Sequence, residues 1–541
     1  MESAGEYDYI IIGAGTAGCV LANRLTRQRD TTVLLIEAGG RDDYVWIHIP
    51  VGYLHCINNP RTDWLYRTEA DAGLGGRALV YPRGKVLGGS SSINGMIYMR
   101  GHSDDYDHWA ELTGDPSWRW DQVLPLFMKS EHHHGGASAI HGVGGEWRVE
   151  KQRLSWEILD AFRDAAEQTG IPKTADFNGG DNFGSSYFDV NQKRGIRWNT
   201  AKAFLKPAAK RDNLTIMTGC HVERLIIEQT EHGPVCRGAE FTGGGKAWRA
   251  TAHKETLLAA GAVGSPHLLQ LSGIGPASLL NGQGVPVQVD LPGVGENLQD
   301  HLQLRMIYKI RGARTLNTSA ASWFGKFKIG LEYAMFQSGP MSMAPSQLGA
   351  FARSDASQTR PNLQYHVQPL SLEKFGDPLH AFPAFTASVA NLHPTSRGHV
   401  RLGSADSYAP PKITPNYLST AQDRATAAAA LTLTRKIVAA PALAKYAPEE
   451  FKPGVHFRTE EELADAAGQI GTTIFHPVGT CKMGQRNDAM AVVDSELRVI
   501  GVAGLRVIDA SVMPTITSGN TNSPTLMIAE KAAEMIVRAR V

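Results

Sequence analysis

Three glycines and one acid near the start of the chain have the spacing of a dinucleotide-binding site. Gly13, Gly15 and Gly18 follow an apolar run, and Glu37 ends a second apolar run. Gly13 permits a tight turn, Gly15 lets the backbone approach a pyrophosphate, and Gly18 lets a helix pack on the strand. The carboxylate of Glu37 can accept hydrogen bonds from a ribose diol and would repel a 2′-phosphate, so the pattern favours FAD or NAD over NADP.

A strand, a helix and a second strand must position these residues. Residues 9–12 predict the first strand, the amphipathic segment 19–25 predicts the helix, and residues 33–37 predict the second strand. The N-terminus of the helix then faces the phosphates. The alternative is a structural βαβ unit that binds no ligand.

The middle of the chain predicts a second sheet of a different kind. Alternating apolar and polar residues at 362–368 and 385–391 are typical of an antiparallel sheet with one buried face. We assign this region to a substrate domain.

The C-terminal segment predicts a helix that begins with a capping residue. A short strand is predicted at 504–509, and Ser523 can cap a helix that begins at Pro524 and extends to Arg540. Because the N-terminal end of a helix is electropositive, an anionic group at this end would be stabilised.

The composition favours small molecules as partners. Lys and Arg total 54 and Asp and Glu total 53, so no net field attracts nucleic acid or anionic lipid. The acidic N-terminus runs directly into the first predicted strand, so we expect no cleaved targeting segment and a cytoplasmic protein. Arg435 and Lys436 interrupt the longest apolar run, residues 425–443, so we expect no transmembrane helix. Peripheral attachment to a membrane stays open.

Neither the cysteines nor a histidine cluster predicts a thiol or metal site. The five cysteines contain no CxxC pair, so we expect reduced thiols, with Cys481 as a small buried residue. His132 to His134 and His141 lie in a Gly-rich stretch without the carboxylate or cysteine spacing of a metal site. We interpret this stretch as a solvated loop and predict no metal.

Three long motifs identify the family that the chain resembles. They are GKVLGGSSSING at residues 84–95, GAVGSPHLLQLSGIG at 261–275 and HPVGTCKMG at 476–484. In this order they resemble motifs of the glucose-methanol-choline (GMC) oxidoreductases, and the resemblance covers essentially the whole chain. Within the family, the chain is similar to choline-dehydrogenase-like alcohol dehydrogenases. The resemblance implies FAD as the cofactor.

The implied fold is α/β, with a Rossmann-like FAD-binding domain and an interleaved substrate domain that is built on an antiparallel sheet with helices. A chain of 541 residues exceeds what one core usually supports, and no linker marks a clean boundary. We expect the FAD-binding domain at 1–155, 196–303 and 470–541. The substrate-binding domain is expected at 156–195 and 304–469.

The resemblance also assigns residues that contact the cofactor. They are Gly13, Gly15, Thr16, Ala17, Gly18, Glu37, Ala38, Gly89, Asn94, Gly95, Met96, Val222, Asp509, Ala510, Asn522 and Thr525. Some choline oxidases carry, at the position of Ile93, a histidine that bonds covalently to the flavin. Isoleucine cannot form this bond, so we expect non-covalent FAD.

The resemblance makes His476 the general base. Oxidation of an alcohol needs a proton removed from oxygen as hydride leaves carbon, and imidazole titrates near working pH. The family pairs this histidine with a second His or Asn that precedes the last helix. Asn522 fits that position better than Asn520, and its amide can donate to the developing alkoxide.

We therefore expect FAD-dependent oxidation of a primary alcohol to an aldehyde by hydride transfer to flavin N5. A quinone-like carrier is the expected electron acceptor, and an alcohol oxidase that uses dioxygen is the alternative. A redox-neutral FAD-containing enzyme of the hydroxynitrile-lyase type and a pyridine-nucleotide dehydrogenase are further alternatives.

Overall fold

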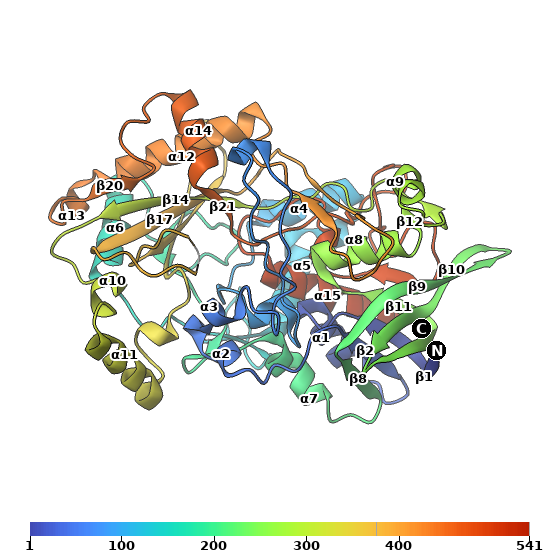
Figure 1. Ribbon diagram of the computed structural model, residues 1–541. Coiled ribbons are helices and arrows are strands. Elements are labelled where there is room, and N and C mark those ends of the chain that lie inside the picture. Colours follow the sequence, from blue (N-terminus) through green and yellow to red (C-terminus); the bar gives the residue numbers. More distant parts are fainter. Residues whose placement is uncertain (375, 540–541) are drawn as a thin grey trace.

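Two large sheets lie side by side in the molecule (Figure 1). The computed structural model describes residues 1–374 and 376–539. One sheet is mixed and carries the glycine fingerprint, and the other is antiparallel. The α/β class that the sequence predicts is therefore confirmed.

The first sheet has the strand order β8-β2-β1-β11-β10-β9, and β22 also pairs with β11. The strands are β1 (Glu2–Ile12), β2 (Val33–Glu37), β8 (Leu214–Thr218), β9 (Cys220–Thr230), β10 (Gly233–Gly243), β11 (Lys246–Leu258) and β22 (Leu505–Val507). Parallel pairing joins β8, β2, β1, β11 and β22, whereas β9, β10 and β11 pair antiparallel. The buried parallel strands are continuous apolar runs, because helices cover the sheet.

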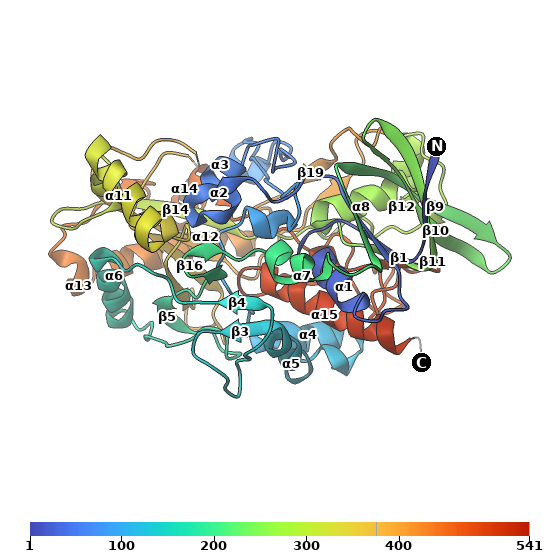
Figure 2. The same ribbon diagram turned by 90° about the horizontal axis from the view of Figure 1, so that it is seen from below.

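The predicted βαβ unit is present with its glycine geometry. Helix α1 (Thr16–Leu25) follows β1 directly and packs against α15 (Asn522–Arg538), as Figure 2 shows. Gly13 has φ +99°, a conformation that side chains rarely adopt. A Cβ at Gly18 would lie 1.9 Å from the carbonyl oxygen of Gly13. The tight turn and the close helix packing therefore both require glycine.

The second sheet has the order β20-β14-β17-β16-β15-β5, and β21 also pairs with β14. Its strands are β5 (Gly184–Tyr187), β14 (Leu302–Lys309), β15 (Leu348–Ala352), β16 (Leu363–Gln368), β17 (Ala384–Asn391), β20 (Glu449–Lys452) and β21 (Gly471–Thr473). Every neighbouring pair is antiparallel. The domain boundaries stay a prediction.

Both faces of this sheet are covered. Leu304 and Met306 of β14 belong to the core that the sheet forms with α6 (Glu157–Gln168) and α12 (Ala421–Val438). The alternating residues Gln303 and Arg305 line a cavity instead. The antiparallel sheet is confirmed, but the predicted single buried face is wrong, because β15, β16 and β17 are buried at almost every residue.

Shorter elements complete the described chain. The remaining helices are α2 (Val45–His48), α3 (Tyr53–Cys56), α4 (Ser103–Thr113), α5 (Trp120–Ser130), α7 (Lys206–Ala208), α8 (Gly261–Leu271), α9 (Ala277–Gly282), α10 (Leu316–Ser319), α11 (Trp323–Phe336), α13 (Pro441–Ala444) and α14 (Glu460–Ile470). The small sheets pair β3 (Glu131–His133) with β4 (Trp147–Val149), β6 (Gln192–Lys193) with β7 (Ile196–Arg197), β12 (Ile274–Gly275) with β13 (Val289–Asp290), and β18 (His399–Arg401) with β19 (Lys412–Thr414).

The last helix begins earlier than the sequence predicts. Thr521 is the N-cap of α15, and Ser523 lies inside the helix with its hydroxyl buried and unpaired among the described residues. The prediction that Ser523 caps this helix is therefore wrong. The helix ends at Arg538, and the predicted end at Arg540 lies outside the described residues. No helix within residues 1–374 and 376–539 combines the length and the apolar content needed to cross a membrane.

Candidate active site

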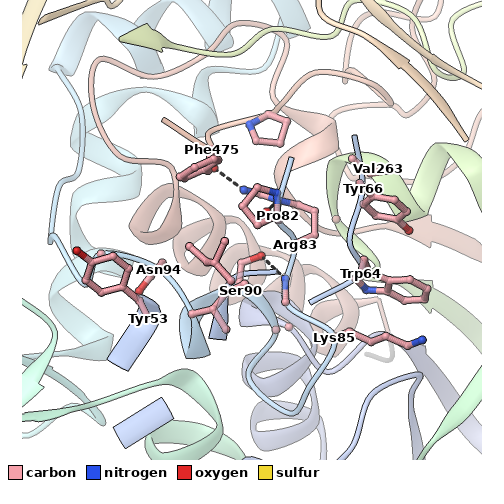
Figure 3. A pocket seen from close by; sticks show the side chains of 18 of the residues that line it. Tyr53, Trp64, Tyr66, Pro82, Arg83, Lys85, Ser90, Asn94, Val263 and Phe475 are labelled. Carbon is pink, nitrogen blue, oxygen red and sulfur yellow. Dashed lines mark hydrogen bonds between the residues drawn. The ribbon is translucent and has the colours of Figure 1, made fainter. Parts of the chain in front are cut away.

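A cavity of about 1290 Å³ extends from the glycine fingerprint to the antiparallel sheet. Gly13 and Glu37 line one end, and His476 and Arg305 line the other. Figure 3 shows part of the wall between them, with Arg83 beside Phe475 and with the rings of Trp64 and Tyr66 on one side. A single elongated ligand can therefore contact both sheets.

The predicted cofactor residues converge on this cavity. Gly13, Gly15, Thr16, Ala17, Glu37, Ala38, Gly89, Asn94, Gly95, Met96, Val222, Asp509, Ala510, Asn522 and Thr525 all line it. Gly18 does not, because it sits at the contact between α1 and β1. The positions come from segments hundreds of residues apart in the sequence.

Two features at the fingerprint fit a dinucleotide. A Cβ at Gly89 would lie 2.7 Å from the Cα of Gly15, so the close approach of the two backbones requires glycine at position 89. Thr16 Oγ1 donates to Asn522 Oδ1 (2.7 Å), which leaves the Asn522 amide N–H group at the cavity wall. This Nδ2 is buried and has no hydrogen-bond partner among the described residues, so it can donate to a bound ligand.

Glu37 is held rigidly at the end of β2. Its Oε2 accepts from the backbone N–H of Ala14 (2.8 Å), and its Oε1 accepts from that of Gly39 (2.8 Å). Burial raises the pKa of Glu37 to about 7, against the opposing effect of these two hydrogen bonds. Each carboxylate oxygen has further lone pairs, so the group can still accept from a ribose hydroxyl.

Ile93 lies at the flavin end of the predicted cofactor site. It lines the cavity and packs against Ile47, Cys56 and Val86. The side chain offers no atom for a covalent link, and non-covalent FAD stays a prediction.

A buried carboxylate positions His476. Asp300 Oδ1 accepts from the His476 backbone N–H (2.8 Å), and its Oδ2 accepts hydroxyl groups of Tyr81 (3.0 Å), Tyr417 (2.5 Å) and Thr473 (2.6 Å). Burial raises the pKa of Asp300, and these hydrogen bonds oppose the rise. The loop that carries His476 is therefore anchored by a fully satisfied acid.

The residue before the histidine has an unusual backbone. Phe475 has φ +69°, which is rare for a residue with a side chain. Its carbonyl accepts from Arg83 Nη2 (2.6 Å), and its N–H donates to Thr473 Oγ1 (2.7 Å). These contacts stabilise a backbone conformation that phenylalanine rarely adopts, and such strain is typical of functional sites.

A chain of hydrogen bonds fixes the tautomer of His476. The carbonyl oxygen of Leu392 can only accept, so His301 Nε2 donates to it (3.2 Å) and His301 Nδ1 is the acceptor. His476 Nδ1 lies 3.1 Å from that nitrogen and must donate to it. His476 Nε2 therefore carries the lone pair, and it accepts from Asn520 Nδ2 (3.0 Å). This assignment leaves a basic nitrogen at the cavity wall.

Burial keeps this imidazole neutral. His476 is 7% exposed, and burial lowers its pKa well below 6.5, with further contributions from His301, His366 and Arg83. The basic form is therefore present at neutral pH.

The structure reverses the order of the two candidate asparagines. Asn520 contacts His476, and its Oδ1 accepts from Gln364 Nε2 (3.4 Å), which orients the amide. Asn522, the preferred choice from the sequence, is hydrogen-bonded to Thr16 at the fingerprint. Asn520 precedes α15 and Asn522 is its first residue, and the two side chains have different partners. We therefore correct the pairing of His476 from Asn522 to Asn520.

Sequence reasoning missed the residues that support the histidine. Asp300, His301 and Gln364 were not predicted, although an acid and a histidine directly before an alternating strand were a usable signal. Their partners are 91 to 219 residues away, which no local pattern reveals.

Only part of the histidine stretch at 132–141 is packed, because His134, Gly135 and residues 137–139 are exposed whereas His141 is buried. His141 is buried between Glu131 (3.1 Å) and Asp176 (2.9 Å), which raise its pKa to about 9 against the opposing effect of burial. The interpretation as a solvated loop is therefore wrong for His141, whereas residues 137–139 are exposed, as that interpretation expects.

Three side chains near this stretch come close enough to hold a metal ion, but their hydrogen bonds disfavour it. His133 and His134 each place Nε2 near Asp189, at 3.3 and 3.1 Å. The N–H of Gly135 donates to His133 Nδ1 (3.1 Å), which requires the proton of that ring to be on Nε2. A metal ligand at Nε2 would need the opposite tautomer.

Cys481 lies near the base but has no access to ligand. It is fully buried, and burial raises the pKa of its thiol well above the usual value. A nucleophilic role is disfavoured, because the thiolate is the reactive form.

Comparison with known proteins agrees with the fold and the site. Residues 7–303 and 394–529 match the family models for the N- and C-terminal parts of GMC oxidoreductases. The chain is 41% identical over 535 residues to an oxygen-dependent choline dehydrogenase of Vibrio vulnificus, covering 98% of this chain and 94% of the relative. It is 40% identical to an alcohol dehydrogenase [acceptor] of Pseudomonas putida, covering 98% and 96%. A pyridoxine 4-oxidase structure from Mesorbium loti matches with a TM-score of 0.89 at 34% identity, covering 98% and 99%.

The chain belongs to the GMC oxidoreductase family. The family resemblance, FAD as the cofactor and an enzyme that acts on CH–OH groups are therefore confirmed. The roles of individual residues remain proposals.

The buried neutral histidines make stability depend on pH. Burial lowers the pKa of His366 to about 3, below its ordinary value of 6.5. The unfolded chain binds a proton more readily below pH 6.5, so the stabilisation is complete above 6.5 and is lost as pH falls. We expect His366 to contribute about 2 kcal/mol of acid destabilisation between pH 7.5 and 5.

Urea unfolding of wild type and His366→Gln at these two pH values measures this contribution. The matched control is His232→Gln, because the His232 side chain is 88% exposed. The free energy of unfolding should fall less for His366→Gln than for wild type or the control. An equal fall in all three proteins would contradict the assignment.

Proposed function

We propose that the protein oxidises a primary alcohol to an aldehyde with His476 as the general base. FAD, when bound, accepts a hydride from the substrate carbon. His476 Nε2 receives the hydroxyl proton, and the Asn520 amide donates a hydrogen bond to the substrate oxygen as charge develops on it. The observation that carries this proposal is the basic Nε2 of His476 at the cavity wall, whose single lone pair accepts from Asn520 Nδ2 here and would accept from the substrate hydroxyl in its place.

His301 has a positioning role in this proposal. Its Nδ1 accepts from His476 Nδ1–H (3.1 Å), and this hydrogen bond becomes charge-assisted when His476 is protonated. Burial lowers the pKa of His301 to about 4, so His301 stays neutral and remains an acceptor. Burial of His476 opposes lasting protonation, which favours return of the proton to solvent or product.

Three substitutions separate catalysis from cofactor binding. His476→Ala should retain FAD and lower the rate of flavin reduction by alcohol about 10²- to 10⁴-fold, because the base is missing. Asn520→Ala should retain FAD and lower the rate about 10²-fold, because a donor to the developing anion is missing. Asn522→Ala should mainly lower the FAD content, because its amide lies at the fingerprint.

Stopped-flow reduction under anaerobic conditions, with FAD content measured by absorbance, distinguishes these effects. A large rate loss in Asn522→Ala at full FAD occupancy, with Asn520→Ala unaffected, would restore the original pairing.

The cavity wall favours alcohols without positive charge. Arg305 lines the cavity, and its guanidinium makes no hydrogen bond or ion pair within the described part of the chain. Glu373, the nearby acid, is already paired with Lys452 and His380. Arg305 of β14 and His366 of β16 both pair with Ser388 of the strand between them, β17. The two ring nitrogens of His366 are buried and have no hydrogen-bond partner among the described residues. We infer a substrate that is neutral or that carries an oxygen acceptor for Arg305.

Choline and its neutral isostere 3,3-dimethyl-1-butanol test this inference. Both are primary alcohols of the same shape, so the rate ratio reports charge alone. We expect the isostere to reduce the flavin at least about tenfold faster, because a cation near Arg305 is repelled in a low-dielectric cavity. Arg305→Gln should lower the ratio of the isostere rate to the choline rate, because the positive charge that repels choline is removed.

Faster reduction by choline would overturn the substrate class and leave the chemistry intact. No reduction by any alcohol would instead contradict alcohol oxidation and favour the redox-neutral alternative.

For the electron acceptor, we favour a quinone-like carrier over dioxygen. The similar proteins include one named for an acceptor and one named for oxygen dependence, so their names differ on this point. Ile474 lines the cavity two residues before the base, where a β-branched side chain narrows the space for a small oxidant.

The acceptor is identified by mixing anaerobically reduced enzyme with air-saturated buffer or with a soluble quinone. Faster reoxidation by the quinone is expected. Ile474→Ala should raise the oxygen rate if the side chain restricts access. A wild type that reacts much faster with oxygen would be an oxidase.

A further inference from the structure

Helix α11 presents its apolar face to solvent. Trp323, Phe324, Phe327, Leu331 and Met335 are between 47% and 79% exposed, and α11 has no buried residue. At 100° per residue these five side chains, with Ala334, fall within about a third of the helix circumference. Figures 1 and 2 both place α11 at the outer edge of the half that contains the antiparallel sheet. An amphipathic helix of a globular protein normally directs this stripe toward the core.

The face of α11 that meets the protein is less apolar than its outer face. Gly325, Ile329, Gly330, Glu332 and Tyr333 are the partly buried positions. Tyr333 donates its hydroxyl to the carbonyl of Gly195 (3.0 Å), and Glu332 accepts from Ser338 (3.4 Å). Polar contacts therefore help to hold the helix, and none of the large apolar side chains of its outer face is buried in the described part of the chain.

The charges beside the stripe indicate what covers it. Lys326 and Lys328 are exposed and make no ion pair with any described residue. Glu332, the acid of this helix, is turned inward to Ser338. The outer face thus combines aromatic and aliphatic side chains with positive charge, the composition of helices that bind anionic bilayers. A symmetric pairing with a second copy would place the lysines of both helices together.

The length of α11 allows it to lie on a membrane but not to cross one. Its 14 residues span about 21 Å, shorter than the hydrocarbon core of a bilayer. We propose that α11 docks the enzyme on the surface of an anionic phospholipid bilayer, with Trp323, Phe327 and Leu331 inserted among the headgroups and upper acyl chains.

This position has a consequence for access to the cavity. Lys326 of α11 and Leu316 of α10 line the cavity that contains His476. A docked enzyme would therefore receive lipid-dissolved alcohol or electron acceptor on its membrane side. This consequence rests on the proposed function, whereas docking itself is measured without turnover.

Cosedimentation of the full-length holoenzyme with vesicles tests the proposal. The vesicles consist of phosphatidylcholine alone or mixed with phosphatidylglycerol. We expect binding to the mixed vesicles and weaker binding to phosphatidylcholine. The triple substitution Trp323→Ser, Phe327→Ser and Leu331→Ser should weaken binding at least about tenfold, because three apolar side chains no longer insert.

The control replaces three exposed valines elsewhere, Val45→Ser, Val143→Ser and Val455→Ser, which are 51–66% exposed. This control should bind vesicles as wild type does. Flavin reduction by a soluble alcohol should be unchanged in the α11 variant, which shows that it folds. Lys326→Glu with Lys328→Glu should abolish the preference for phosphatidylglycerol.

Equal vesicle binding by wild type and the α11 variant would overturn the proposal. So would a wild type that ignores vesicles and forms a dimer by light scattering that the α11 substitutions dissociate, because the stripe would then contact a second copy.

Discussion

One buried carboxylate holds together the catalytic end of the cavity. Asp300 binds hydroxyl groups from three separate segments and the backbone N–H of His476. Removal of the Asp300 carboxylate would leave its buried hydrogen-bond donors without an acceptor, which would lower the free energy of unfolding. The orientation of His476, the strained backbone at Phe475 and the position of β21 all depend on this contact. The next residue, His301, fixes the proton of the same imidazole.

The fold assigns the two halves of the cavity to different sheets. The mixed sheet supplies backbone glycines and the acid Glu37 at the turn that follows each parallel strand, where ligands bind in such sheets. The antiparallel sheet supplies side chains, because Gln303 and Arg305 of β14 and His366 and Gln368 of β16, which alternate along their strands, line the cavity. In the proposed assignment, the cofactor is recognised mainly by backbone shape and the substrate mainly by side-chain chemistry.

The charge on α11 and on the cavity wall at Arg305 differs from the nearly neutral charge of the whole chain. The chain has nearly equal numbers of basic and acidic residues, and we expected no attraction to anionic lipid on that basis. At α11, however, two lysines without an ion-pair partner among the described residues flank an apolar stripe, and inside the cavity Arg305 has no acid partner among those residues. Electrostatic interaction falls off within about 10 Å at ordinary salt, so the nearest charges decide binding rather than the total.

The sequence by itself determined the dinucleotide fold and the family. Gly18 and Glu37 act through contacts within one βαβ unit, and Gly13 acts through its own backbone conformation, so these residues leave a fixed spacing in the sequence. The motif around His476 likewise identified the candidate base. Only the tertiary structure separated the contacts of Asn520 from those of Asn522, because two side chains two residues apart have different partners, His476 and Thr16. The tertiary structure also revealed the hydrogen bonds from Leu392 through His301 to His476. It likewise revealed that the apolar face of α11 is exposed, since a pattern of residue types predicts which side of a helix is apolar but not what that side contacts.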